Sequence, residues 1–103
     1  MNALAALAEP TRRRIVELLA DQERSAGEIA SHFETSRPAI SRHLRVLREH
    51  GLVRTREDAQ RRLYSLAPEP LQELDEWLQR YRGFWDNRLD ALGTEIQRRR
   101  HNP

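Results

Sequence analysis

Residues 25–66 constrain the fold of this chain more than any other segment. Ser25 and Glu28 have the spacing of a capping box, in which a hydroxyl and a carboxylate each accept a hydrogen bond from a backbone N–H at a helix start. A turn follows, and the sequence from Ser36 to Gly51 then predicts an arginine-rich helix. Two short segments, 52–57 and 62–66, predict strands joined by a turn at 58–61. This order predicts a helix-turn-helix at 25–50 followed by a wing at 52–66.

The arginine-rich helix is predicted to have one apolar and one basic side. Ile40, Leu44 and Leu47 recur at spacings of four and three residues, which places them on one face. Gly51 suits the left-handed conformation that commonly ends a helix. The residues on the opposite face and its flank are Arg37, Pro38, Ser41, Arg42, Arg45, Arg48 and Glu49.

Charge is distributed unevenly along the chain, although its net value is only +2. Residues 36–62 contain eight arginines and three acids, a net charge of +5. Residues 1–35 have a net charge of −2 and residues 63–97 one of −4. Positive charge concentrated on one predicted helix and its wing is the distribution expected of a nucleic-acid-binding surface.

Length and composition favour one small domain spanning residues 1–103. Hydrophobic residues make up 38% of the chain and charged residues 33%, so a monomer has limited capacity to form a core and would gain stability by oligomerising. The absence of cysteine excludes disulfides and thiolate metal sites. We find neither a signal peptide nor a segment long enough to cross a bilayer, and therefore expect a soluble cytoplasmic protein with no membrane partner.

The ends of the chain predict a dimer interface. A first helix is expected at 2–7, a second begins at Pro10, and a long last helix at 68–100 carries apolar residues every three or four positions, with Gly83 marking a bend or a close helix approach. Such a stripe on a small domain needs a partner, most simply a second copy. The predicted interface residues are Leu4, Leu7, Leu74, Leu78, Tyr81, Trp85, Leu89 and Leu92.

Three stretches, 7–15, 36–44 and 47–53, together resemble the ArsR family of bacterial winged-helix repressors. The stretch 36–44 is the most specific, because its order of serine, proline, isoleucine, serine, histidine and leucine is unusual in other helix-turn-helix proteins. The resemblance covers residues 3–66 in motif detail and the remainder in architecture. It implies a homodimer built on the first and last helices, with the arginine-rich helix in the major groove and wings over the flanking backbone. It also implies an autoregulatory transcriptional repressor.

The chain departs from the metal-sensing members of that family. It lacks their thiolate pair, and the last predicted helix offers Asp86 and Asp90 but no histidine before His101, too late to complete the paired pattern of zinc and nickel sensors. Glu9 replaces the more usual aspartate before the proline, and the wing turn lacks its usual glycine. Residues 81–92 instead resemble a metal-independent subgroup, so we expect no metal and no cofactor.

The candidate DNA-binding residues lie on the arginine-rich helix and the wing. Arginine can donate two hydrogen bonds to guanine, and serine can donate or accept; the alternative is a solvated helix face that contacts phosphates only. The wing arginines suit phosphate or minor-groove contact, or form an edge that discourages strand pairing. The predicted DNA-binding residues are Ser36, Arg37, Pro38, Ser41, Arg42, His43, Arg45, Arg56, Arg61 and Arg62.

The histidines and the aromatic cluster have alternative interpretations. His43 and His50 lie about 10 Å apart along a helix, whereas zinc ligands lie about 2 Å from one ion, so one chain cannot use both. We expect His43 to pack at the edge of the core or to bond to backbone or phosphate, and His32 to lie at the surface. The aromatic cluster is expected to be dimer core rather than an effector pocket, and no effector can be named; its residues are Trp77, Tyr81, Phe84 and Trp85.

No pattern in the sequence supports catalysis. Ser41 and His43 project from different faces of one helix, no carboxylate completes a triad, and no glycine-rich phosphate loop is present. We interpret the chain as a non-enzymatic, sequence-specific repressor that binds an inverted repeat in double-stranded DNA as a homodimer. A winged-helix module that binds another protein is the alternative, and an effector-binding regulator is a third hypothesis. The net charge of +5 on residues 36–62 favours DNA.

Overall fold

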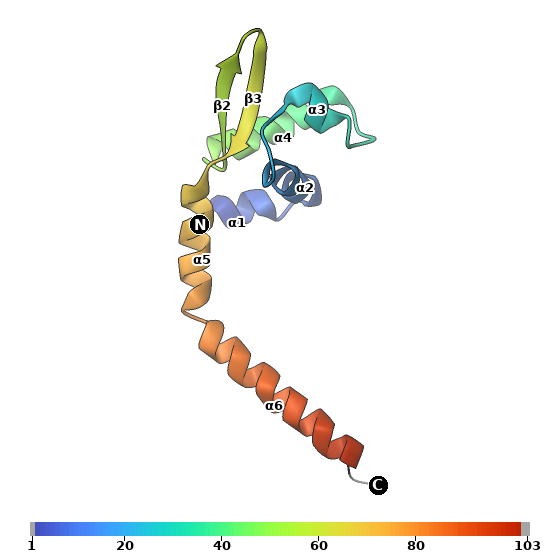
Figure 1. The fold of residues 1–103 in the computed structure, drawn as a ribbon, viewed down its shortest axis with the longest axis vertical. Helices are drawn as coiled ribbons and strands as arrows, with labels where there is room; N and C mark the ends of the chain where they lie inside the picture. Colours follow the sequence, from blue (N-terminus) through green and yellow to red (C-terminus); the bar gives the residue numbers. More distant parts are fainter. Residues whose placement is uncertain (1, 102–103) are drawn as a thin grey trace.

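The computed structural model of the chain describes the backbone of residues 2–101 and the side chains of residues 3–93. Met1, Asn102 and Pro103 of the expected domain lie outside the described residues, as do the side chains of Ile96 and of the arginines at 98–100. Short helices pack together in the amino-terminal half, a β-hairpin rises from them, and two further helices lead away (Figure 1). The expected fold class, mainly α with a β-hairpin wing, is confirmed.

Three helices of the amino-terminal half begin after a residue whose side chain caps them. The Ser25 hydroxyl accepts a hydrogen bond from the Glu28 N–H at 3.2 Å, and the Glu28 carboxylate accepts one from the Ser25 N–H at 3.4 Å, which confirms the capping box. Ser36 accepts from the Ala39 N–H at 3.3 Å. Glu9 reaches the Arg12 N–H at 2.8 Å, so this longer acid still caps its helix. The helices are α1 (Asn2–Leu7), α2 (Pro10–Leu19), α3 (Ala26–Ala30) and α4 (Arg37–Glu49).

The core lies between α2, α3 and α4. Ile15, Ile29 and Leu47 are fully buried, as are Ile40 and Leu44 to within 1% of their surface. Burying one such side chain contributes about 1.5–3 kcal/mol, so these residues fix the orientation of α4. The helix ends as predicted: Gly51 has φ 73°. The N–H groups of Gly51 and Leu52 donate to the carbonyls of Arg48 and Leu47, at 3.0 and 2.9 Å.

A three-stranded antiparallel sheet follows, in the order β1-β3-β2. The hairpin strands β2 (Val53–Asp58) and β3 (Arg61–Leu66) are each one residue longer at the turn than predicted. Ala59, in the turn, has φ 57°, a conformation that glycine adopts with less strain. The third strand, β1 (Arg24–Ser25), was not predicted: it pairs with Tyr64 and Leu63 of β3 and ties the wing to the start of α3.

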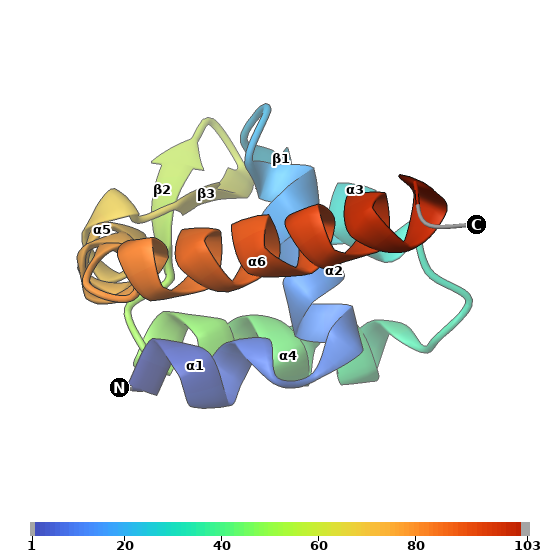
Figure 2. The same cartoon turned by 90° about the horizontal axis from the view of Figure 1, so that it is seen from below.

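The prediction of a single helix at 68–100 is wrong. The chain forms two helices, α5 (Pro68–Gln79) and α6 (Arg82–His101), with a break at Arg80 and Tyr81. The N–H groups at the break bond three residues back, to Trp77 and Leu78, which tightens the last turn of α5 and ends it before Gly83. Figure 1 shows α6 leaving the body of the molecule, and in the view from below α6 crosses in front of α2 (Figure 2). The radius of gyration is accordingly 19.2 Å, against about 13 Å for a compact domain of this length.

Candidate nucleic-acid interface

The buried face of α4 determines which of its residues face outward. Because Ile40, Leu44 and Leu47 point into the core, the opposite face is exposed to solvent over the whole helix. Most of the predicted DNA-binding residues are exposed on this face, on its flank or at the helix cap. Those that are exposed on α4 or at its cap are Ser36, Arg37, Pro38, Ser41, Arg42 and Arg45.

The four arginines of α4 have no acidic partners among the described residues. Neither an ion pair nor a side-chain hydrogen bond is formed there by Arg37, Arg42, Arg45 or Arg48. Their guanidinium groups therefore keep their hydrogen-bond donors for an external acceptor. Arginine suits this use, because its planar group bonds in pairs to a phosphate or to a guanine edge.

The wing arginines are arranged differently, because each one pairs with a carboxylate of its own chain. Arg56 donates from Nε and Nη2 to the two oxygens of Glu23, both at 2.8 Å. Arg61 donates to Glu28 at 3.2 Å and Arg62 to Glu57 at 3.5 Å. A fourth arginine of the wing, Arg54, pairs with Glu69 at the start of α5. Of the acids that make these pairs, the sequence singled out Glu28 alone, and only as part of the capping box.

The pair between Arg56 and Glu23 is the best formed of these contacts. The side-chain hydrogen bond from Arg56 lowers the pKa of the Glu23 carboxyl below its usual 4.5, and the same bond raises the pKa of Arg56. Both groups stay charged at neutral pH. Both are also solvent-exposed, so water and salt screen the attraction between them.

His43 lies at the edge of the core, as expected, with 24% of its side chain exposed. Its Nδ1 is 3.7 Å from a carboxylate oxygen of Glu9 and 3.5 Å from Nη1 of Arg12. Partial burial opposes ionisation of Glu9, but the backbone N–H groups of Arg12 and Thr11 outweigh it and lower the pKa of that carboxyl. Nδ1–H of His50 donates to the Val46 carbonyl at 2.8 Å, and His32 is exposed. His43 thus connects α4 to the start of α2.

The residues predicted to form a dimer interface are largely exposed. Leu89 retains 63% of its surface and Trp85 56%, and no residue of α5 is buried. Leu4, Leu78, Tyr81 and Leu92 are also exposed, whereas Leu7 and Leu74 are half-buried. A hollow of about 320 Å³ opens on this face. Its lining residues are Trp77, Leu78, Tyr81, Phe84 and Trp85.

The structure also shows residues beside the predicted ones that the sequence did not mark. Ser25 was assigned only a capping role and Tyr64 none, yet both line a cleft with Arg37, Arg61 and Arg62. The signal that was available is strand alternation, which places Arg62 and Tyr64 on one face of β3. Among the described residues, no group of three histidines or acids is placed to hold a metal ion. None of the described helices is long and apolar enough to span a membrane.

A buried core beneath an exposed arginine helix, with a hairpin beside it, defines the class of winged helix-turn-helix DNA-binding proteins. Comparison with known proteins gives the family. The model of the bacterial regulatory proteins of the arsR family matches residues 9–55. The chain is 36% identical to the transcriptional repressor SdpR of Bacillus subtilis over 85% of its own length and 98% of that protein. The chain belongs to the ArsR family.

Two further similarities bear on the functional assignment. The transcriptional activator HlyU of Vibrio cholerae is 42% identical over 75% of this chain and 71% of its own length. A crystal structure of a possible transcriptional regulator for arsenical resistance is 44% identical and superimposes with a TM-score of 0.72. That superposition covers 92% of this chain and 96% of the other. Membership of this family makes the chain a DNA-binding transcriptional regulator and not an enzyme.

Proposed function

We propose that the chain is a homodimeric repressor that binds an inverted repeat upstream of its own gene in the cytoplasm. The observation that carries this proposal is the row of arginines on α4, exposed and without acidic partners in the described structure. They form the electrostatic surface that a polyanion would bind first. The residues proposed to contact DNA are Ser36, Arg37, Pro38, Ser41, Arg42, His43, Arg45, Arg56, Arg61 and Arg62.

A second copy of the chain is the proposed occupant of the apolar face on α5 and α6. Every residue from Leu78 to Gly93 is exposed, and an extended helix with tryptophan, tyrosine and leucine on its surface gains stability by packing against another. Leu4 is exposed on α1, which contacts α5, so it could extend this surface (Figure 1). A twofold axis there would present two copies of α4, which in helix-turn-helix dimers lie about 34 Å apart, to successive turns of DNA.

Repression is favoured over activation by how much of each relative the chain matches. The repressor relative is matched over 98% of its length and the activator relative over 71%. A small-molecule effector is not part of the proposal.

Fluorescence anisotropy with DNA from immediately upstream of the gene, beside a scrambled duplex and across a salt series, tests the DNA-binding part. We expect tighter binding to the upstream fragment at every salt concentration. Equal and steeply salt-dependent binding to both duplexes would show that the protein binds DNA only nonspecifically. Absence of binding to either would make a protein-interaction module the better interpretation. A promoter fused to a reporter then separates repression from activation.

Leu78→Asp and Trp85→Asp test the interface. Each places a carboxylate on the apolar face, where pairing would bury it without a partner, so both variants should sediment as monomers. Gln72→Asp adds the same charge at an exposed position of α5 and should leave the dimer intact. Dimers that persist in both interface variants would contradict the assignment.

A further inference from the structure

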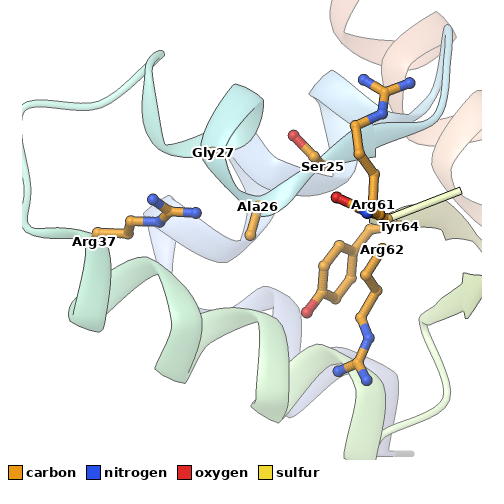
Figure 3. A pocket seen from close by; sticks show the side chains of 8 residues that line it. Ser25, Ala26, Gly27, Arg37, Arg61, Arg62 and Tyr64 are labelled. Atoms are coloured by element: carbon orange, nitrogen blue, oxygen red, sulfur yellow. The ribbon is translucent and has the colours of Figure 1, made fainter. Parts of the chain in front are cut away.

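A cleft of about 450 Å³ lies where the start of α4 meets the wing and the start of α3 (Figure 3). The side chains around it include three arginines and two hydroxyl groups: Ser25, Arg37, Arg61, Arg62 and Tyr64. None of the described carboxylates is among its lining residues, although Glu28 and Glu57 pair with Arg61 and Arg62 at its margin. The cleft therefore concentrates positive charge between two elements that are expected to contact DNA.

Arg37 faces β3 across this cleft. Figure 3 shows its guanidinium pointing toward Ala26, with Tyr64 across the gap, while the Arg62 side chain extends from β3 toward α4. A methyl group added at Gly27 would lie 3.6 Å from Nη2 of Arg37, so the missing side chain keeps the space beside the guanidinium open. Arg62 and Tyr64 lie two positions apart on one strand and share a face, so they act as a unit.

The donors around the cleft retain hydrogen-bonding capacity. Within the described residues Arg37 forms no ion pair, and the Tyr64 hydroxyl has no hydrogen-bond partner. Arg62 contacts Glu57 through Nε alone, at 3.5 Å, which leaves both terminal nitrogens without a described acceptor. Donors that line one open space from two sides are suited to an oxyanion.

We propose that this cleft binds one phosphodiester group of the DNA backbone, held by Arg37 and Arg62 with Tyr64 as a neutral donor. The proposal rests on the proposed function and adds a contact that sets the angle between α4 and the wing. A phosphate offers oxygens in several directions, so it can accept from guanidinium groups on opposite sides. With α4 in the major groove and the wing over the flanking backbone, a sugar-phosphate strand passes between them, where the cleft lies.

A bridging phosphate has a measurable signature. Such a contact fixes the register of the protein on the duplex but carries no base information. Arg37→Gln and Arg62→Gln should therefore each weaken binding to operator and to scrambled DNA by the same factor, about tenfold. Each should also reduce the steepness of log affinity against log salt by about one.

The decisive experiment neutralises one phosphate at a time. Operator duplexes that each carry a single methylphosphonate are bound to the wild type, to Arg37→Gln and to Arg62→Gln. We expect one phosphate position whose neutralisation weakens DNA binding by the wild type about tenfold. The same neutralisation should weaken binding by either variant much less, because the contact is already lost. Arg80→Gln removes an exposed arginine at the end of α5, away from the wing, and should keep the full loss (Figure 1).

Gly27→Leu provides a variant that keeps every charge, because it fills the cleft without removing an arginine. It should lose sensitivity to the same phosphate, provided that thermal unfolding shows the fold intact. Suppose that the wild type prefers operator to scrambled DNA, but that no phosphate position depends on both Arg37 and Arg62. That result would overturn the cleft assignment alone. A wild type without that preference would overturn the repressor function instead.

A free oxyanion is the other source of the same chemistry. Inorganic phosphate, titrated at constant ionic strength, is followed through the amide resonances of Gly27 and Tyr64. Weak, non-saturating shifts support a site that needs the DNA backbone. Saturable binding of inorganic phosphate, combined with the absence of a coupled DNA phosphate, would assign the cleft to a small anion and contradict the proposal.

Discussion

The arginines of α4 and those of the wing carry the same charge but differ in their surroundings. On α4, Arg42 and Arg45 stand on the face opposite the core with no acid partner among the described residues. On the wing, Arg56 is held by both oxygens of Glu23 and Arg61 by Glu28. A DNA phosphate would add a contact on α4, whereas on the wing it would have to replace one.

This difference assigns unequal shares of binding energy to the two regions. An arginine without an internal partner gives its full interaction to DNA, while a paired arginine gives only the difference between a phosphate and the carboxylate it leaves. The wing pairs also hold the hairpin against the start of α3, where Glu23 and Glu28 lie. We therefore expect α4 to determine specificity and most of the affinity, and the ion pairs of Arg56 and Arg61 mainly to hold the wing in position; Arg62, whose terminal nitrogens lack a described acceptor, is the exception.

The largest effect is expected for Arg42→Ala and Arg45→Ala. Each should lower operator affinity by about 1–3 kcal/mol if the side chain contacts a base. Anisotropy with the upstream fragment measures the loss, and Arg80→Ala on α5 is the matched removal of an exposed arginine. Operator binding unchanged in both α4 variants would contradict the special status of this helix.

A smaller effect is expected for Arg56→Ala. Its removal should weaken operator and scrambled DNA alike, by less than about fivefold, because an exposed ion pair is exchanged for a phosphate contact. Binding curves on the two duplexes at one salt concentration measure this loss. A loss as large as that of Arg42→Ala would show that the ion pair with Glu23 does not limit the contribution of Arg56 to DNA binding.

Glu23→Gln is expected to strengthen DNA binding rather than weaken it. This variant removes the acid that occupies Arg56 and one negative charge near the wing, so it should tighten binding to any duplex by about two- to fivefold at low salt. Glu73→Gln makes the same change of charge on the exposed surface of α5. If the two variants tighten binding equally, net charge rather than the pairing of Arg56 explains the gain.

Much of the α4 region could be predicted from the sequence, because its determinants are local. The caps at Ser25 and Ser36, the apolar spacing of Ile40, Leu44 and Leu47, and the stop at Gly51 all act within a few residues. The wing pairs could not be predicted, since Arg56 and Glu23 are 33 residues apart and any exposed acid could serve. The strand β1 and the break at Tyr81 depend on tertiary pairing and on the last turn of α5, which periodicity does not report.

The smallest effect concerns the shape of the wing rather than its charge. Ala59→Gly relieves a left-handed backbone conformation, φ 57°, at the hairpin turn. The gain in unfolding free energy should be about 0.5 kcal/mol, because the added flexibility of glycine in the unfolded chain offsets part of the relief. Thermal or urea unfolding measures it, and DNA affinity should stay the same. A destabilised variant would mean that the alanine methyl group makes a packing contact worth more than the strain.

One ratio tests whether α4, and not the wing, reads the bases: operator affinity divided by scrambled-DNA affinity. It is measured at one salt concentration for the wild type, Arg42→Ala and Arg56→Ala. We predict that the ratio falls sharply for Arg42→Ala and stays near the wild-type value for Arg56→Ala, since only α4 reads bases. A ratio that falls for the wing variant and is retained by the α4 variant would contradict the account.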